Sequence, residues 1–241
     1  DENNYTQMST EKPAFTEAGT HTIYYYAVCD NFKAVSGSVK VVINKAPLTV
    51  TVPDAELTYG DAPADVLDDL AKEQQNKNQL KADGFAGSDN WEKVFGSSRI
   101  TFETDYKQYG KAGNWKITAK GLDAENYEIR AEAGTLTVKP KKITFTWQDE
   151  KTFTYDGNAH GIKAEVNGKV RNSDDVAPGG YTGNTATAAG AYTAVVTKLT
   201  GADAGNYTFD ENETTAQQNF TIEKADNRFT IHPVINDWTE G

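Results

Sequence analysis

The fold is decided by the stretch Gly134-Thr135-Leu136-Thr137-Val138-Lys139-Pro140 and by its continuation Ile143-Thr144-Phe145-Thr146-Trp147. In both runs apolar side chains alternate with threonines, and this period of two is typical of β-strands that bury one face. β-Branched and aromatic residues, which strands favour, fill the apolar positions. Because proline fixes its own φ and keeps its predecessor extended, the connection at Lys139-Pro140 is short and stiff. One strand therefore closes a unit here and another strand opens the next.

The closing pattern occurs three times, each time downstream of a glycine and an Asn-aromatic pair. The glycine precedes that pair by 12 to 16 residues in every copy. The lysines that close the copies, Lys45, Lys139 and Lys224, lie 94 and 85 residues apart, which is the size of one immunoglobulin-like sandwich. The three copies are Gly19-Thr20-His21 with Asn31-Phe32, Gly113-Asn114-Trp115 with Asn126-Tyr127, and Gly190-Ala191-Tyr192 with Asn206-Tyr207.

The openings of the units are also alike. Thr58-Tyr59-Gly60-Asp61 follows the first opening strand, and Thr154-Tyr155-Asp156-Gly157 follows the second. We therefore predict an all-β chain of tandem immunoglobulin-like β-sandwiches in an elongated arrangement. Its predicted parts are the C-terminal part of a preceding module (1–46), two complete modules (47–139 and 140–224) and the opening strand of a following one (225–241). Within the second complete module, Asn167-Gly168 predicts a two-residue hairpin turn.

One stretch departs from the strand pattern. Residues 65–81 contain Val66, Leu67, Leu70 and Leu80 among polar residues, with neither Gly nor Pro. The 66, 67, 70 spacing suits one face of a short helix. We expect a helix or an ordered loop near 65–81 that covers an edge of the sheet.

The motifs of residues 47–139 resemble the MBG-type repeat of bacterial surface proteins. The resemblance rests on Thr58-Tyr59-Gly60-Asp61, Gly113-Asn114-Trp115, Asn126-Tyr127 and the closing run 134–138. Residues 140–224, with Tyr155-Asp156-Gly157, resemble the related bacterial immunoglobulin-like repeats that open with Tyr-Asp-Gly. The inserts 65–81 and 208–219 are departures from both. The resemblance implies strings of modules in adhesins and cell-wall proteins, and it brings no catalytic residues.

Composition narrows the function further. The net charge of −11 disfavours a nucleic-acid partner, since an acidic surface repels phosphates. The single cysteine, Cys29, excludes a disulfide framework, and its strand-like surroundings predict a buried, inert thiol. No apolar run is long enough to span a membrane. We therefore expect no membrane segment here, and either a cytosolic protein or one whose signal peptide and anchor lie outside these residues. The repeats favour the second, an extracellular location on the bacterial surface.

The sequence contains few residues that could act in catalysis or bind a metal. The histidines His21, His160 and His232 fall one to a module, and His21 holds the repeat position of Trp115 and Tyr192, which favours a packing role over a ligand role. The acidic pairs Asp68-Asp69 and Asp174-Asp175 lack the alternating array of a calcium loop, so solvated loop carboxylates are the better interpretation. We expect no enzyme activity, no catalytic residues, no cofactor and no metal.

Aromatic residues offer the remaining binding hypothesis. The Asn-Tyr pairs at 126–127 and 206–207 are best explained as tyrosine corners, with the hydroxyl bonded to backbone and the asparagine closing the turn. Other rings could stack on a sugar, although Tyr106 and Tyr109 could equally pack on a sheet edge. These ligand candidates are Trp91, Phe95, Tyr106, Tyr109 and Tyr181.

The functional expectation follows from the joints. Connections of a few residues that contain proline favour a semi-rigid stalk or spacer of a bacterial surface or secreted protein. Its partners would then be neighbouring modules of the same chain. One alternative is an adhesin module that binds host glycan or a host surface protein through residues 65–109. The other is an accessory module of a secreted enzyme.

Overall fold

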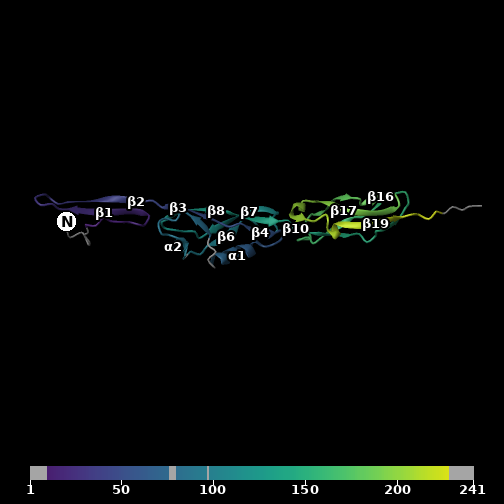
Figure 1. Cartoon of the computed structure of the whole chain (residues 1–241), viewed down its shortest axis with the longest axis horizontal. Helices are drawn as coiled ribbons and strands as arrows, with labels where there is room; N and C mark the ends of the chain where they lie inside the picture. The colour runs from purple at the N-terminus through teal and green to yellow at the C-terminus, as the bar shows by residue number, and fades with distance from the viewer. Residues whose placement is uncertain (1–9, 76–79, 97, 228–241) are drawn as a thin grey trace, which may run out of the picture. The chain divides into compact units, whose positions relative to one another are not determined.

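The computed structural model describes residues 10–75, 80–96 and 98–227 of the chain, and strands dominate it (Figure 1). Its contacts divide the chain into two compact units. The first contains Asp1–Leu57 and Asp61–Val138, and the second contains Thr58–Gly60 and Lys139–Gly241. The division after Val138 lies beside the predicted boundary at Lys139. The tripeptide Thr58–Gly60, however, belongs to the second unit although its neighbours in sequence belong to the first.

The first unit has a hairpin followed by two sheets. The hairpin pairs β1 (Gly19–Ala27) with β2 (Val35–Ile43) in antiparallel register. A three-stranded sheet has the order β5-β3-β8 and a four-stranded sheet the order β4-β9-β7-β6. The three-stranded sheet consists of β3 (Ala46–Thr51), β5 (Lys81–Asp83) and β8 (Tyr127–Glu132). The four-stranded sheet consists of β4 (Ala55–Thr58), β6 (Thr101–Thr104), β7 (Gly113–Lys120) and β9 (Gly134–Lys139).

The alternating pattern in the sequence is the burial pattern of these strands. Leu48 and Val50 of β3 are buried, as are Leu136 and Val138 of β9, while the threonines between them are less so. Each sheet thus turns one apolar face inward, as a sandwich requires. The all-β prediction is confirmed.

The second unit has a four-stranded sheet of order β12-β19-β17-β15, which faces shorter strand pairs. The sheet consists of β12 (Thr152–Thr154), β15 (Ala177–Thr182), β17 (Gly190–Thr200) and β19 (Gln217–Glu223). The pairs are β10 (Lys141–Lys142) with β18 (Tyr207–Thr208), β11 (Thr144–Trp147) with β14 (Ala164–Asn167), and β13 (His160–Gly161) with β16 (Thr185–Ala186). Phe145, Trp147, Val196, Phe220 and Ile222 form the core between them.

The two units share a pairing scheme. In the first, Ala46 of β3 lies opposite Tyr127 of β8 in a parallel pair, and β3 is antiparallel to β5. In the second, Lys141 of β10 lies opposite Tyr207 of β18 in a parallel pair, and β11 is antiparallel to β14. The orders β4-β9-β7-β6 and β12-β19-β17-β15 also correspond strand for strand. The sequence similarity between the units therefore has a topological counterpart.

Among the described residues, the two α-helices lie in the first unit, and the second unit has two 3₁₀ turns, Ala204–Asn206 and Thr214–Ala216. The predicted helix is present as α1 (Pro63–Gln75), and it lies against β6, the edge strand of the four-stranded sheet. An edge cover is thus its structural role. A second short helix, α2 (Trp91–Phe95), was not predicted, because five residues are too few to show a helical period. It begins where the Asn90 side chain accepts a hydrogen bond from the Lys93 amide at 3.0 Å. Among the described residues, no helix is both long and apolar enough to cross a membrane.

Two local predictions are wrong. Asn167-Gly168 does not form a tight hairpin, since β14 ends at Asn167 and pairs with β11. Cys29 is exposed, because β1 ends at Ala27 and the cysteine falls in the loop that leads to β2. The opening strands do follow the closing strands closely. Only Asn44 and Lys45 separate β2 from β3, and only Pro140 separates β9 from β10.

The core of the second unit gives a direct stability test. Replacing the buried Ile222 by alanine removes apolar contacts and leaves a cavity, so we expect Ile222→Ala to lower the free energy of unfolding of this unit by about 2–5 kcal/mol. Glu223→Ala, one position along the strand and exposed, should change it by less than about 0.5 kcal/mol. Amide hydrogen exchange in β17 and β19 measures both effects, and equal effects would contradict the assigned register.

Candidate functional site

A buried carboxylate forms the centre of the most elaborate polar site. Asp174 is only 2% exposed and follows β14 in the second unit. Its Oδ2 accepts hydrogen bonds from the Tyr59 hydroxyl at 3.0 Å and from the Tyr207 hydroxyl. Its Oδ1 accepts two from Arg171, from Nε at 2.8 Å and from Nη2 at 2.7 Å. A buried carboxylate is costly unless it is paired and hydrogen-bonded, and here both oxygens are satisfied.

Backbone interactions position each donor. The Tyr59 amide donates to the Lys139 carbonyl at 2.8 Å, which fixes the tripeptide against the end of β9. The Tyr207 hydroxyl accepts a hydrogen bond from the Val170 amide at 2.9 Å. The two tyrosine rings meet edge to face at 5.3 Å, a favourable aromatic geometry. Gly60 has a φ of 102°, and a Cβ there would lie 2.7 Å from Val170 Cγ1, so this turn requires glycine.

The site shifts the pKa values of its members. Burial raises the pKa of Asp174, but the hydrogen bonds from Tyr207, Tyr59 and Arg171 outweigh it, so the pKa of that carboxyl is lowered overall. Burial and the hydrogen bond to Asp174 raise the pKa of Tyr207 to about 12 and also raise the pKa of Tyr59. At neutral pH the site therefore holds one carboxylate, one guanidinium and two neutral phenols.

The acidic pairs Asp68-Asp69 and Asp174-Asp175 were predicted to be solvated loop carboxylates, and this prediction is wrong for Asp174. Asp174 is buried, not solvated, because hydrogen bonds from Tyr59, Tyr207 and Arg171 compensate for the loss of hydration of its carboxylate. Asp175 is exposed and accepts a hydrogen bond from the Ala202 amide at 2.9 Å. Asp68 and Asp69 are exposed on α1. Within residues 10–75, 80–96 and 98–227, no group of His, Cys, Asp or Glu side chains is arranged to hold a metal.

A simpler version of the site exists in the first unit. The Tyr127 hydroxyl donates to Asp89 Oδ2 at 2.6 Å and accepts from the Ala86 amide at 3.0 Å. Tyr127 and Tyr207 are both buried, so the predicted tyrosine corners are confirmed. Asn126 does not close its own turn as predicted. Its side chain instead accepts from the Ala18 amide and donates to Glu17, at 2.7 Å each.

The sequence did not predict that Asp89 and Asp174 accept the hydroxyls of the corner tyrosines. Each precedes its tyrosine by a similar interval, 38 residues for Asp89 and 33 for Asp174. That shared spacing was the available signal. It is weak, because unrelated acidic residues are common in so acidic a chain.

His21, Trp115 and Tyr192 occupy the same position in the repeat, and each places a polar side-chain atom against a backbone carbonyl. His21 Nε2 lies 2.8 Å from the Glu17 carbonyl, Trp115 Nε1 donates to the Lys111 carbonyl at 3.1 Å, and the Tyr192 hydroxyl donates to the Ala188 carbonyl at 2.8 Å. In each case the acceptor is four residues upstream. His21 also stacks on Phe15 at 4.3 Å. This position therefore has a packing role in all three copies. His160 lies apart, against Asp156 at 2.9 Å, and His232 is outside the described residues.

The structure does not bring the five ligand candidates together on one surface. Trp91, Phe95 and Tyr106 are buried in the first unit, so their faces cannot stack on a sugar. Tyr181, in the second unit, is half-buried, and its hydroxyl is hydrogen-bonded to the backbone of Ala164. Tyr109 is 42% exposed, in a turn with a φ of 69°. Of the five rings predicted as a sugar-binding surface, Tyr109 is the one that is exposed.

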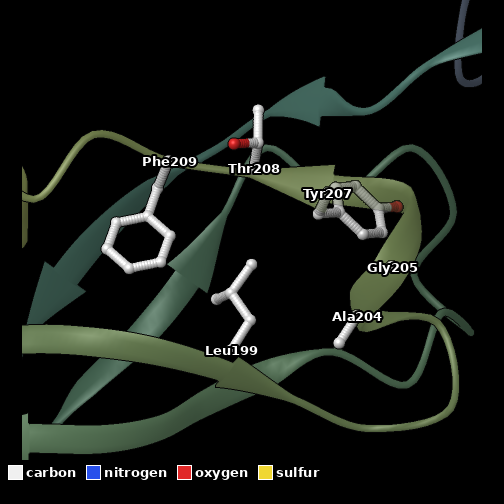
Figure 2. Close-up of a pocket in the computed structure, with 6 residues that line it drawn as sticks. All are labelled: Leu199, Ala204, Gly205, Tyr207, Thr208 and Phe209. Carbon is white, nitrogen blue, oxygen red and sulfur yellow. The ribbon is translucent and has the colours of Figure 1, made fainter.

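A pocket of about 360 Å³ lies beside the tyrosine corner of the second unit. In Figure 2, Leu199 extends from β17 toward the segment that carries Tyr207 and Phe209, and Thr208 points away from it. The lining has no charged side chain. Its lining combines apolar side chains with the hydroxyl-bearing residues Tyr207 and Thr208, and the Tyr207 hydroxyl is engaged with Asp174.

The hydrogen bond from the Tyr59 hydroxyl to Asp174 predicts that Tyr59 stabilises the second unit. Tyr59→Phe removes one hydrogen bond to a buried carboxylate while it keeps the ring, so we expect this unit to lose about 1.5–3 kcal/mol. Tyr155→Phe is the matched control, since Tyr155 is 44% exposed, and it should cost less than about 0.5 kcal/mol. Hydrogen exchange of amides in β17 and β19 reports on both variants. Equal protection in Tyr59→Phe and the natural chain would contradict the assignment.

The raised pKa of Tyr207 predicts a loss of stability in alkali. Its pKa is about 12 in the folded chain and 10.0 ordinarily, so the folded state favours the neutral phenol. This contribution is fully present below about pH 10 and is lost as the pH rises from about 10 through about 12. Tyr207→Phe should be less stable at neutral pH but should lose less stability over that window. Denaturant titrations at pH 8 and pH 11 measure the difference, and parallel losses would refute it.

Comparison with known proteins agrees with the motifs of the first unit. The family model described as "MBG domain (YGX type)" matches residues 48–137, which include Tyr59-Gly60-Asp61. Among solved structures, the chain is similar to FdeC, an adhesin of Escherichia coli, with 11% identity over 79% of this chain and 69% of that one and a TM-score of 0.25. No curated protein matches the sequence. Residues 48–137 therefore form a stretch that matches the MBG domain family, in its YGX type.

Proposed function

We propose that the chain is a non-catalytic repeat segment of a bacterial cell-surface or secreted protein and that it acts as a semi-rigid stalk or spacer. The observation that carries this proposal is the tyrosine of the Tyr-Gly motif. Tyr59 lies within the stretch that matches the MBG family, yet its side chain is buried in the second unit against Asp174 and Tyr207. The segment Thr58–Gly60 is thus held in the fold of the second unit, and we infer that this leaves little free chain at the joint.

The connections support the same role. A single proline, Pro140, separates β9 from β10, and proline has a fixed φ. A Gly/Ser-rich linker would behave as a flexible coil instead. The polar groups of the Asp174 site are engaged with one another, which supports a structural role for this site. The match to an MBG domain supports a surface location.

Nuclear magnetic relaxation tests the stiffness. If the stalk is semi-rigid, ¹⁵N relaxation should give the two units the same overall correlation time. A variant with eight Gly/Ser residues inserted after Lys139 is the control, and its units should tumble separately with shorter correlation times. Separate tumbling in the natural chain, as fast as in the inserted variant, would contradict the proposal.

A different class of function is adhesion through residues 65–109, with host glycan or surface protein as the partner. The observation in its favour is the exposed ring of Tyr109. A glycan array and a pull-down with host surface proteins test it. Binding that Tyr109→Ala abolishes would support adhesion, and no binding would favour the spacer.

A further inference from the structure

The corner of the first unit repeats the aspartate and the corner tyrosine of the Asp174 site, without a second tyrosine or an arginine hydrogen-bonded to its aspartate among the described residues. In the second unit the carboxylate accepts two phenolic hydroxyls, from the corner residue Tyr207 and from Tyr59. In the first unit, Asp89 accepts the hydroxyl of the corner residue Tyr127. Among the described residues of that unit, no second tyrosine lies against Asp89.

An open cavity lies at this position. It has a volume of about 380 Å³, which is within the range of small-ligand sites. Asp89 and Tyr127 both line it, together with residues of α2 and of the turn before β8: Lys93, Val94, Ser98, Asp123, Ala124, Glu125 and Asn126. Residues 124–126 come directly before Tyr127, the first residue of β8, as residues 204–206 come directly before Tyr207, the first residue of β18. The cavity is therefore next to the corner that Tyr59 fills in the other unit.

Its charge selects the kind of occupant. Three carboxylates, Asp89, Asp123 and Glu125, line the cavity, and its one lysine is engaged elsewhere. Lys93 Nζ donates to the Ser88 carbonyl at 2.7 Å and to the Ser88 hydroxyl at 3.0 Å. Such a lining repels anions and attracts cations and hydrogen-bond donors, and the Tyr59 hydroxyl on Asp174 is the donor found at the equivalent corner. A phenol meets this requirement, since it has a ring for the wall and a hydroxyl for Asp89.

The chain also presents the complementary group. Tyr155 stands where Tyr59 stands in its own module: the amide of each donates to the carbonyl that ends the closing strand, Glu223 for Tyr155 and Lys139 for Tyr59, at 2.8 Å in both. Tyr59 is buried, whereas Tyr155 is 44% exposed and borders a cavity of about 560 Å³ with Lys224 and Ala225. One tyrosine of this kind is therefore docked and the other is presented to solvent.

We propose that the Asp89–Tyr127 cavity is a docking site for the tyrosine of a Tyr-Gly segment supplied by another module of the same kind, and that Tyr155 is the corresponding donor toward a following module. Each joint in the string would then consist of one phenol bound to one aspartate. This inference rests on the proposed role as a repeat segment and specifies how such segments recognise one another.

A peptide with the sequence of Thr58–Gly60 is the probe, because it carries no charge. Acetyl-Thr-Tyr-Gly-amide is titrated into the ¹⁵N-labelled full chain, and the matched control is acetyl-Thr-Phe-Gly-amide. We expect saturable shifts of the Asp89, Asn126 and Tyr127 amides with a dissociation constant on the order of a few millimolar. The phenylalanine peptide should bind at least about tenfold more weakly, since it lacks the hydrogen bond to a carboxylate. No shifts should occur around Asp174, where Tyr59 already fills the site.

Two variants complete the test. Asp89→Asn preserves the size of the side chain and removes its charge, so it should weaken the peptide by a similar factor. Tyr59→Ala should open a second site, with new shifts around Asp174 and Tyr207. The inference is overturned by an absence of shifts at about 20 mM peptide, by equal binding of both peptides, or by unchanged binding to Asp89→Asn. If the two units share one correlation time but the chain binds no peptide, the docking inference is refuted and the proposed stalk function is retained.

Discussion

The burial of Asp174 is the constraint on which the second unit depends. A carboxylate taken out of water loses hydration, and only direct hydrogen bonds and an opposite charge compensate for it. Here those partners come from three separated segments, through Tyr59, Arg171 and Tyr207. Because the segments must all be in place at once, the site couples the turn after β4 to the fold of the second unit.

This coupling explains how a chain with one exposed cysteine can dispense with disulfides. In many small sandwiches a disulfide links the two sheets. Here aromatic cores and tyrosine corners stabilise the sandwiches instead. The corner recurs in both units with a backbone amide on its hydroxyl and an aspartate beyond it. The repeat therefore preserves a hydrogen-bonding scheme as well as a strand order.

Patterns that are local in sequence predicted local structure well. The alternation at 134–138 and 143–147 corresponds to β9 and β11, and the apolar spacing at 66, 67 and 70 falls in α1. The tyrosine corners were also predictable, since a buried Tyr after a turn asparagine is a recognisable pair. The equivalence of His21 with Trp115 and Tyr192 followed from their place after the glycine.

Features that depend on distant partners were not predictable in the same way. Asp174 looks like a loop carboxylate until Tyr59, 115 residues away, is placed beside it. Trp91 and Phe95 lie outside any strand pattern, and only the short helix α2 turns both inward. The pair Asn167-Gly168 has the composition of a tight hairpin, but β14 already has its partner in β11. In each case a tertiary contact outweighed the local preference.

The central claim is that Tyr59 and Asp174 stabilise the second unit through each other. A double-mutant cycle with Tyr59→Phe, Asp174→Ala and the combined variant, read by hydrogen exchange in β19, measures that coupling directly. The account predicts a coupling free energy of about 1–3 kcal/mol, so that the second substitution costs much less in the presence of the first. Additive losses, with a coupling near zero, would contradict it.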